Sequence, residues 1–358
     1  MKLLRAILRL LGALVRPLFS AALEDLDDGR QRRLGATHVA TTLGTFQDRA
    51  RSRTIPYKLY YPDDGVGADG PHPVVIFSHG LGGSREAAPY LGEALAQNGY
   101  YAVFIQHAGS DETLLEGARS GDEIRARLRG ATTNPSVAVD RFRDLPAAIS
   151  GLEEMNRSER FGGQLDLARI GMAGHSFGAR GVMMAAGQRM GPMGAPFKDP
   201  RVRAGIAFSP NLPPQMMPGQ RPAAAFDTVD IPLFHITGTK DGMPVGEDGA
   251  GGGGRGFDPQ TRTLPFRYIR AAHQYLLVLK DAHHNTFSSR LRNIEDIDPD
   301  EMESPTVGGP EELRHVQTLG MAVVMFFDAY LKRDESAQKM LKGGFAQTLS
   351  PGDRFEFK

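Results

Sequence analysis

The stretch from residue 168 to residue 186 constrains the fold of this chain more than any other. A short apolar run, Ile170 to Ala173, has the length of a buried strand and leads directly into Gly174-His175-Ser176-Phe177-Gly178. The apolar residues 182–186 that follow predict a buried helix. A strand, a G-x-S-x-G turn and a helix in this order are the context of a nucleophile elbow, in which a strained serine stands above a sheet.

The glycines on either side of this serine have a steric explanation. A side chain at Gly174 or Gly178 would collide with the neighbouring strand or helix, so a turn this tight needs glycine at both positions. The Ser176 hydroxyl would also lie at a helix N-terminus, where the dipole stabilises negative charge. The alternative is a chance match in a chain with 43 glycines, and the flanking strand and helix argue against it. We therefore predict that Ser176 is a nucleophile.

Short apolar runs alternate with helical patterns along the rest of the chain. Strands are predicted at 37–44, 54–61, 74–77, 101–105, 204–208, 233–236 and 275–279, and helices at 86–98, 137–156 and 311–331. Pro146 is expected to kink or restart the second helix. The stretch 109–135 is long and polar. The alternation indicates the α/β fold class, with a doubly wound, mainly parallel sheet.

Length and composition limit the remaining choices. The 358 residues suffice for one large α/β domain, which we place at 54–345, with 23–53 as a linker or edge segment and 346–358 as a C-terminal tail. Basic and acidic residues number 42 each, so no net field favours nucleic acid as a partner. The chain has no cysteine, which excludes disulfides, thiolate catalysis and Cys-based zinc sites.

Residues 1–22 have a pattern of their own. Their apolar length is interrupted too often to cross a bilayer, which needs roughly 20 apolar residues. One side of a predicted helix carries Lys2, Arg5, Arg9 and Arg16, opposite an apolar face. We favour a basic amphipathic helix on an anionic membrane surface, and the alternatives are a signal peptide ending near residues 20–22 or a helix docked on the domain. A cytoplasmic or peripheral membrane location is therefore preferred, with export as the alternative.

A serine nucleophile needs a base, and the base needs an orienting acid. In doubly wound sheets the catalytic groups collect at the carboxyl ends of the strands. The predicted strand 233–236 leads to Asp241 at that edge, whereas the preceding strand ends in Ser209-Pro210-Asn211 and offers no carboxylate. We predict Asp241 as the acid, and the alternative is an aspartate that only forms a turn.

Two adjacent histidines follow the predicted strand 275–279. Neighbouring side chains in a loop point in different directions, so at most one of His283 and His284 can face Ser176. We favour His284 as the base, with His283 as the alternative and otherwise a packing or capping residue. No third ligand stands at a recognised spacing from the pair, so we predict no metal site.

The oxyanion of an acyl-transfer intermediate needs hydrogen-bond donors. The predicted strand 74–77 ends in Ser78-His79-Gly80-Leu81-Gly82-Gly83, whose small residues let a substrate approach the backbone. We predict the backbone N–H of Leu81 as one donor. The second is the N–H of Phe177, because it follows the nucleophile in the elbow.

With these motifs in view, the chain resembles the α/β-hydrolase superfamily. Within it, the chain is similar to the platelet-activating-factor acetylhydrolase-like esterases and to related bacterial lipase and PET-hydrolase-like esterases. The resemblance covers residues 54–332 and rests on His79-Gly80-Leu81-Gly82, the elbow 174–178, the segment 281–287 and the order Ser176, Asp241, His284. It implies a serine ester hydrolase without metal or cofactor, in which His284 is the catalytic histidine.

Two departures limit what the resemblance implies. The acetylhydrolases proper place their acid after the strand that here ends at Phe208-Ser209-Pro210, where this chain has no carboxylate. The acid is then expected at Asp241, as in the wider superfamily, and phospholipid specificity does not carry over. The dienelactone hydrolases, which are also similar in outline, use a cysteine that this chain lacks.

These expectations give one main hypothesis and two rivals. The main one is a carboxylic-ester hydrolase that works through an acyl-enzyme on a small-molecule or lipid-like ester. The substrate class rests on the basic segment 1–22, which would contact a membrane, and on four methionines that could line an apolar pocket: Met183, Met184, Met216 and Met217. The rivals are an acyltransferase or peptidase on the same triad, and a non-catalytic hydrolase-fold binding protein.

Overall fold

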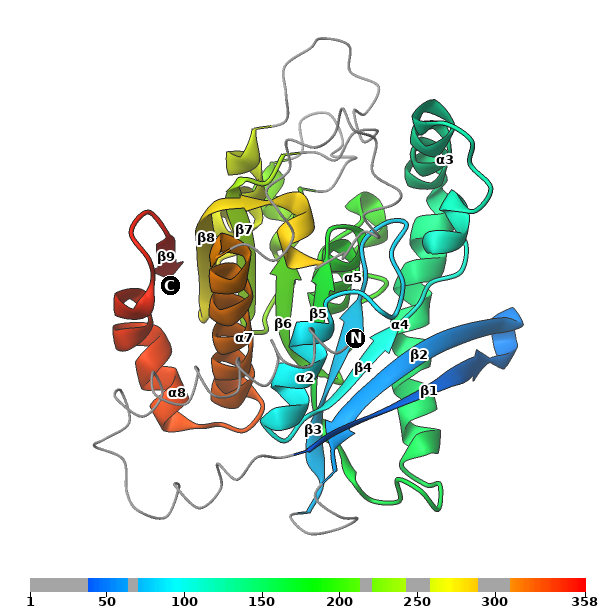
Figure 1. Cartoon of the computed structure of the whole chain (residues 1–358), viewed down its shortest axis with the longest axis horizontal. Helices are drawn as coiled ribbons and strands as arrows, with labels where there is room; N and C mark the ends of the chain where they lie inside the picture. The colour runs from blue at the N-terminus through cyan, green and yellow to red at the C-terminus, as the bar shows by residue number, and fades with distance from the viewer. Residues whose placement is uncertain (1–37, 64–69, 213–220, 243–257, 289–309) are drawn as a thin grey trace.

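A nine-stranded sheet forms the centre of the molecule. The computed structural model describes residues 38–63, 70–212, 221–242, 258–288 and 310–358; the predicted helix at 1–22 and the residues Met216 and Met217 lie outside these ranges. The strands are β1 Val39–Asp48, β2 Arg53–Pro62, β3 His72–Ser78, β4 Tyr101–Ile105, β5 Leu165–His175, β6 Val202–Phe208, β7 Leu233–Lys240, β8 Gln274–His283 and β9 Arg354–Phe357. Their order in the sheet is β1-β2-β4-β3-β5-β6-β7-β8-β9 (Figure 1).

The mainly parallel sheet predicted from the sequence is confirmed. The six strands from β3 to β8 pair in parallel. The strands β1, β2 and β9 add antiparallel pairs at the two edges. The edge strand expected at 37–44 is β1, and β9 lies in the segment 346–358 that the sequence analysis treats as a tail. Because parallel strands end at one edge, the segments after β3, β5, β6, β7 and β8 meet there.

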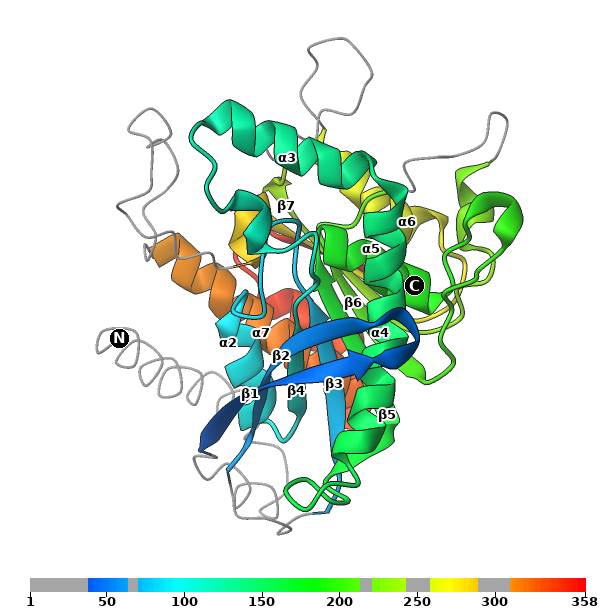
Figure 2. The ribbon, with the colours of Figure 1, turned by 90° about the vertical axis from the view of Figure 1, so that its right-hand side faces the viewer.

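Helices cover both faces of the sheet. They are α2 Pro89–Gln97, α3 Gly121–Thr133, α4 Pro135–Met155, α5 Phe177–Ala186, α6 Leu264–Tyr268, α7 Pro310–Tyr330 and α8 Glu335–Lys339. The helices α2 and α7 lie on one face, and α4 and α5 lie on the other (Figures 1 and 2). Within the described ranges, no helix is both long and apolar enough to span a bilayer.

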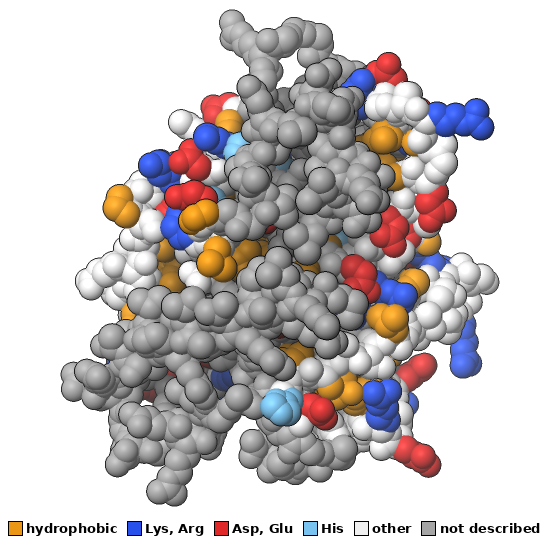
Figure 3. All heavy atoms as spheres, in the orientation of Figure 1, with side chains coloured by type: hydrophobic (Ala, Val, Ile, Leu, Met, Phe, Trp, Pro, Cys, Tyr) orange, Lys and Arg blue, Asp and Glu red, His pale blue; other side chains and the backbone are white. Residues whose placement is uncertain are grey.

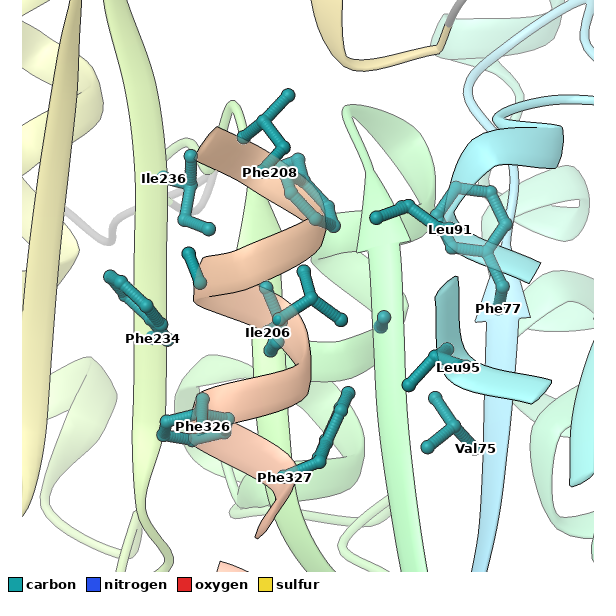
Figure 4. Close-up of a cluster of buried hydrophobic side chains, with 14 of the residues drawn as sticks. Val75, Phe77, Leu91, Leu95, Ile206, Phe208, Phe234, Ile236, Phe326 and Phe327 are labelled. Carbon is teal, nitrogen blue, oxygen red and sulfur yellow. The ribbon is translucent and has the colours of Figure 1, made fainter. Parts of the chain in front are cut away.

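The strands bury side chains on both faces, as their uninterrupted apolar runs predict. In β3, Val75 and Phe77 belong to the apolar cluster under α2 and α7, whereas Val74 and Ile76 belong to the cluster under α4 and α5. Figure 4 shows the first cluster, with side chains from the strands and from both helices interleaved. On the described parts of the face shown in Figure 3, acidic and basic side chains lie near one another, in keeping with the balanced charge.

One helix passes through a proline, and another was not predicted. The helix α4 continues through Pro146, so of the two expected outcomes, a kink or a restart, the restart is excluded. The helix α3 occupies part of the stretch 109–135, to which the sequence analysis assigns no helix, because its composition is polar. The Ser120 side chain caps α3 by accepting a hydrogen bond from the Glu123 backbone N–H, so a Ser-x-x-Glu capping pattern was present in the sequence. Figure 2 shows α3 at the upper end of the molecule, above α5.

Candidate active site

The elbow around Ser176 joins the end of β5 to the start of α5. Ser176 has φ 54° and ψ −110°, a strained conformation for a residue with a side chain. A Cβ on Gly178 would overlap the carbonyl oxygen of Ser78, and a Cβ on Gly174 would lie 2.5 Å from the carbonyl group of Gly178. The two glycines are therefore required by close backbone contacts, as the motif predicts.

The predicted acid and base meet at the carboxyl edge of the sheet. Asp241 follows β7, and His284 begins the 3-10 turn η7 His284–Phe287 directly after β8. The strands β7 and β8 pair in parallel, which brings their ends together. The His284 Nδ1 atom lies 2.8 Å from Asp241 Oδ1, a hydrogen-bond distance.

The Asp241 carboxylate is fully buried and is held by several donors. The hydroxyls of Ser209 and Thr237 each donate to its Oδ2 atom at 2.7 Å. Burial raises the pKa of Asp241, but the hydrogen bond from His284 and the charge of Arg262 outweigh it, so the net pKa lies below its ordinary value. The carboxylate is therefore ionised at neutral pH and accepts the His284 Nδ1–H.

A buried arginine that the sequence analysis missed completes this cluster. Arg262 lies in the 3-10 turn η6 Pro259–Thr263, and its Nε is 2.9 Å from Asp241 Oδ1. Its Nη1 donates to the Ser209 carbonyl at 2.8 Å, and its Nη2 lies 3.1 Å from His284 Nδ1. Because η6 is short and stands apart in sequence from both partners, no local pattern in the chain pointed to this arginine.

The neighbouring histidine, His283, has a different role in the structure. Its backbone N–H donates to Thr286 Oγ1 at 3.0 Å, and its side chain accepts a hydrogen bond from the Thr286 backbone N–H. These two bonds form a capping box at the start of η7. His283 therefore caps the turn that carries His284, and only His284 is seen in contact with Asp241.

The acid–base pair lies close to the elbow. The rings of His175 and His284 have their centroids 4.6 Å apart, and His175 directly precedes Ser176. Burial, and then the nearby His284, keep the pKa of His175 well below its usual value, so this ring is neutral. A neutral ring next to Ser176 therefore packs against the predicted base His284.

The loop after β3 lies against the serine. A Cβ added to Gly80 would be 3.6 Å from the Ser176 Cβ. The amides of Gly82 and Gly83 donate to the carbonyls of Ser110 and Gly80, at 2.9 and 3.1 Å. Among the described residues, the backbone N–H groups of Leu81 and Phe177 have no protein acceptor. Their role as donors to a substrate oxygen stays a prediction. Within those residues, no group of three or more His, Asp or Glu side chains could hold a metal ion.

The chain is similar to known proteins in sequence and in fold. The family model described as platelet-activating factor acetylhydrolase, isoform II, matches residues 53–114, which include β2, β3, the Leu81 loop and β4. No curated protein sequence matches the chain. Among solved structures, the ferulic acid esterase from Streptomyces cinnamoneus has a TM-score of 0.59 at 19% sequence identity, covering 90% of this chain and 97% of that one. The predicted resemblance is confirmed: the protein has an α/β-hydrolase fold, and its residues 53–114 are similar to the platelet-activating factor acetylhydrolase isoform II family.

Proposed function

We propose that the protein is a carboxylic-ester hydrolase with Ser176 as nucleophile, His284 as base and Asp241 as orienting acid. The observation that carries the proposal is the 2.8 Å hydrogen bond between His284 and Asp241 beside an elbow whose serine has φ 54°. An ionised carboxylate that accepts the Nδ1–H leaves the other ring nitrogen, Nε2, as an acceptor, which is what a base for serine requires.

The proposed reaction proceeds through an acyl-enzyme. His284 Nε2 takes the Ser176 proton while Oγ attacks the ester carbonyl, and the amides of Leu81 and Phe177 stabilise the oxyanion. The protonated imidazole then gives its proton to the leaving alcohol, which leaves an acyl group on Ser176. Water, deprotonated by His284, releases the acid and restores the serine.

For the substrate, we propose a hydrophobic or lipid-like ester. Two leucines support an apolar wall beside the loop 79–83 after β3, which carries Leu81 and is called the oxyanion loop below. A Cβ at Gly82 would lie 3.4 Å from Leu128 of α3 and 3.6 Å from Leu115. The similar proteins are named for acyl esters, an acetylhydrolase family and a ferulic acid esterase. In this proposal, the acyl group bound to Ser176 packs against the aliphatic surface of these two leucines.

The test is labelling with a fluorophosphonate probe together with turnover of p-nitrophenyl esters of increasing acyl length. We expect the wild-type protein to label and to hydrolyse esters, and Ser176→Ala to lose labelling and several orders of magnitude in kcat. The adjacent histidines supply a matched pair of variants: His284→Gln should abolish turnover, whereas His283→Gln should keep it within a fewfold. A folded wild-type protein that neither labels nor hydrolyses any ester, or a fully active Ser176→Ala, would overturn the proposal.

A further inference from the structure

A second buried polar cluster lies behind the oxyanion loop. The Ser78 Oγ atom is 2.9 Å from His107 Nε2, and His107 Nδ1 is 2.9 Å from Asp144 Oδ2. The three side chains come from the end of β3, the loop after β4 and the helix α4. Their exposed fractions are 2%, 0% and 0%, so this serine–histidine–aspartate chain is closed to any substrate.

The charges in this cluster fix the direction of each hydrogen bond. Burial lowers the pKa of His107 to about 4, so the imidazole is neutral at pH 7. Burial raises the pKa of Asp144, but the hydrogen bonds from His107 and Arg53 lower it by more. The net pKa lies below its ordinary value, so the carboxylate stays ionised. His107 therefore donates Nδ1–H to Asp144 and accepts the Ser78 hydroxyl proton at Nε2, which leaves the Ser78 oxygen free to accept.

Arg141 fills that acceptor position and extends the cluster to the loop. Its Nη2 donates to Ser78 Oγ at 3.1 Å and also to the carbonyl of His79, while its Nη1 donates to Ser110 Oγ at 2.9 Å. The guanidinium carbon lies 4.7 Å from the centre of the Phe177 ring. One fully buried side chain thus touches the loop that carries Leu81 and the residue that supplies the second predicted donor.

These contacts fix the direction of the Leu81 N–H through the backbone of the loop. A trans peptide unit points its C=O and N–H in opposite directions, so the direction of the Gly80 carbonyl sets that of the Leu81 N–H. The His79 ring holds this carbonyl through Nδ1 at 2.6 Å. The ring is held in turn at Nε2 by the His107 amide, at 3.2 Å. The carbonyl of His79 is bound by Arg141.

We propose that Arg141, supported by Ser78, His107 and Asp144, is a positioning residue that holds the oxyanion loop in its donor geometry. The inference rests on the proposed function, because it concerns the same oxyanion site. The cluster is anchored at its far end by two arginines of the β1–β2 hairpin: Arg51 and Arg53 bind the Asp144 carboxylate at 2.8 and 2.7 Å. The loop is thereby tied to a part of the fold that lies outside the parallel strands.

Steady-state kinetics on Arg141→Gln and Arg141→Lys test this role. Because a small misplacement of catalytic groups costs about 10²-fold in rate, we expect Arg141→Gln to lower kcat by about that factor with KM nearly unchanged. Arg141→Lys keeps the charge and should recover part of the rate. The affinity for a trifluoromethyl ketone, whose adduct carries the oxyanion, should fall in parallel with kcat/KM. If Arg141 only stabilised the fold, its replacement would not lower the ketone affinity together with kcat/KM.

The control is Arg201→Gln. Arg201 binds Glu153 of α4 at 3.0 Å and Asp199 at 2.7 Å, so it also ties a charged cluster to this helix without contacting the loop. It should lower the melting temperature and leave kcat unchanged. If Arg141→Gln does not fold, Ser110→Ala removes one acceptor of Arg141 and should lower kcat severalfold with the same loss of inhibitor affinity.

The possible results separate the two proposals. Loss of stability in the Arg141 variants with wild-type kcat and wild-type inhibitor affinity would overturn the positioning role while leaving the esterase intact. A wild-type protein that fails to label and to hydrolyse esters would overturn the proposed function and this inference together. A selective loss of kcat and of ketone affinity in Arg141→Gln, with partial recovery in Arg141→Lys, would establish the role.

Discussion

Arg262 lies 3.1 Å from the same nitrogen of His284 that faces Asp241 at 2.8 Å. The carboxylate of Asp241 is thus shared between an imidazole and a permanently charged guanidinium, both in the protein interior. A buried carboxylate needs such compensation, because desolvation would otherwise favour its protonated form. Together with His284, Arg262 therefore allows Asp241 to remain an ion although its side chain has no solvent contact.

Replacing Arg262 with Met should destabilise the protein strongly. Removing one partner of a buried ion pair leaves the other charge uncompensated, which costs about 3–5 kcal/mol of unfolding free energy. The control is Arg267→Met, since Arg267 pairs with Glu356 at 3.1 Å on the surface, where a pair contributes about 0–1 kcal/mol. Urea unfolding of both variants would measure the difference. Equal losses of unfolding free energy in the two variants would show that the buried pair contributes no more to stability than the surface pair.

Replacing Asp241 with Asn should remove most of the activity. An amide cannot accept the His284 Nδ1–H as a carboxylate does, and comparable changes in serine hydrolase triads lower kcat by about 10⁴. We also expect lower stability, since Arg262 would lose its counterion. Kinetics with p-nitrophenyl acetate and circular dichroism of the same sample would separate the two effects. Activity close to that of the wild type would exclude Asp241 as the orienting acid.

Because His235 is buried, we expect the free energy of unfolding to fall in mild acid. Burial lowers its pKa to about 3 from an unperturbed value of 6.5. Between these pH values the unfolded chain binds a proton that the folded protein does not, so stability falls as pH decreases from about 6.5 towards 3. The slope from one such group is at most about 1.4 kcal/mol per pH unit.

The variant His235→Gln should lower the slope of unfolding free energy against pH by the contribution of this one group, at most about 1.4 kcal/mol per pH unit. His107 and His175 also have lowered pKa values, so part of the pH dependence should remain. Unfolding free energies from urea titrations between pH 4.5 and 7, in steps of roughly half a pH unit, would give the slope. An unchanged slope would mean that His235 takes up its proton in the folded protein.

Two glycine-to-alanine changes should act in opposite directions. In Gly178→Ala the new methyl group would overlap the Ser78 carbonyl, so the elbow cannot form and labelling of Ser176 should be lost. Gly130 lies in α3, and nothing is found within 4 Å of a Cβ added there. Gly130→Ala should therefore stabilise the protein by about 0.5–1 kcal/mol. Normal labelling of Gly178→Ala would contradict the close contact.

Local sequence signals explain which parts of the fold could be predicted. Uninterrupted apolar runs mark strands that are covered on both faces, and every strand predicted in this way is present. The meeting of Asp241 and His284 follows from their places after adjacent parallel strands. Steric demand at the elbow explains the two glycines. Each of these features depends on a few consecutive residues or on the order of the strands.

The features that were missed depend on polar contacts between distant segments. Arg262 reaches His284 and Asp241 from a short turn, and Arg141 reaches the loop after β3 from the middle of α4. Neither arginine stands in a motif, because its partners are set by tertiary packing. The helix α3 was missed for another reason: its apolar positions are few, and only the Ser120 cap signalled its start.

The order of the parallel strands has a consequence for the rate at which the protein folds. The neighbours β3 and β5 are separated in the chain by β4 and the three helices α2, α3 and α4, so their pairing closes a large loop. Such non-local contacts form slowly, because the entropy of loop closure is lost before the contacts compensate for it. During refolding, regained reactivity of Ser176 towards a fluorophosphonate should therefore lag behind the recovery of helical circular dichroism.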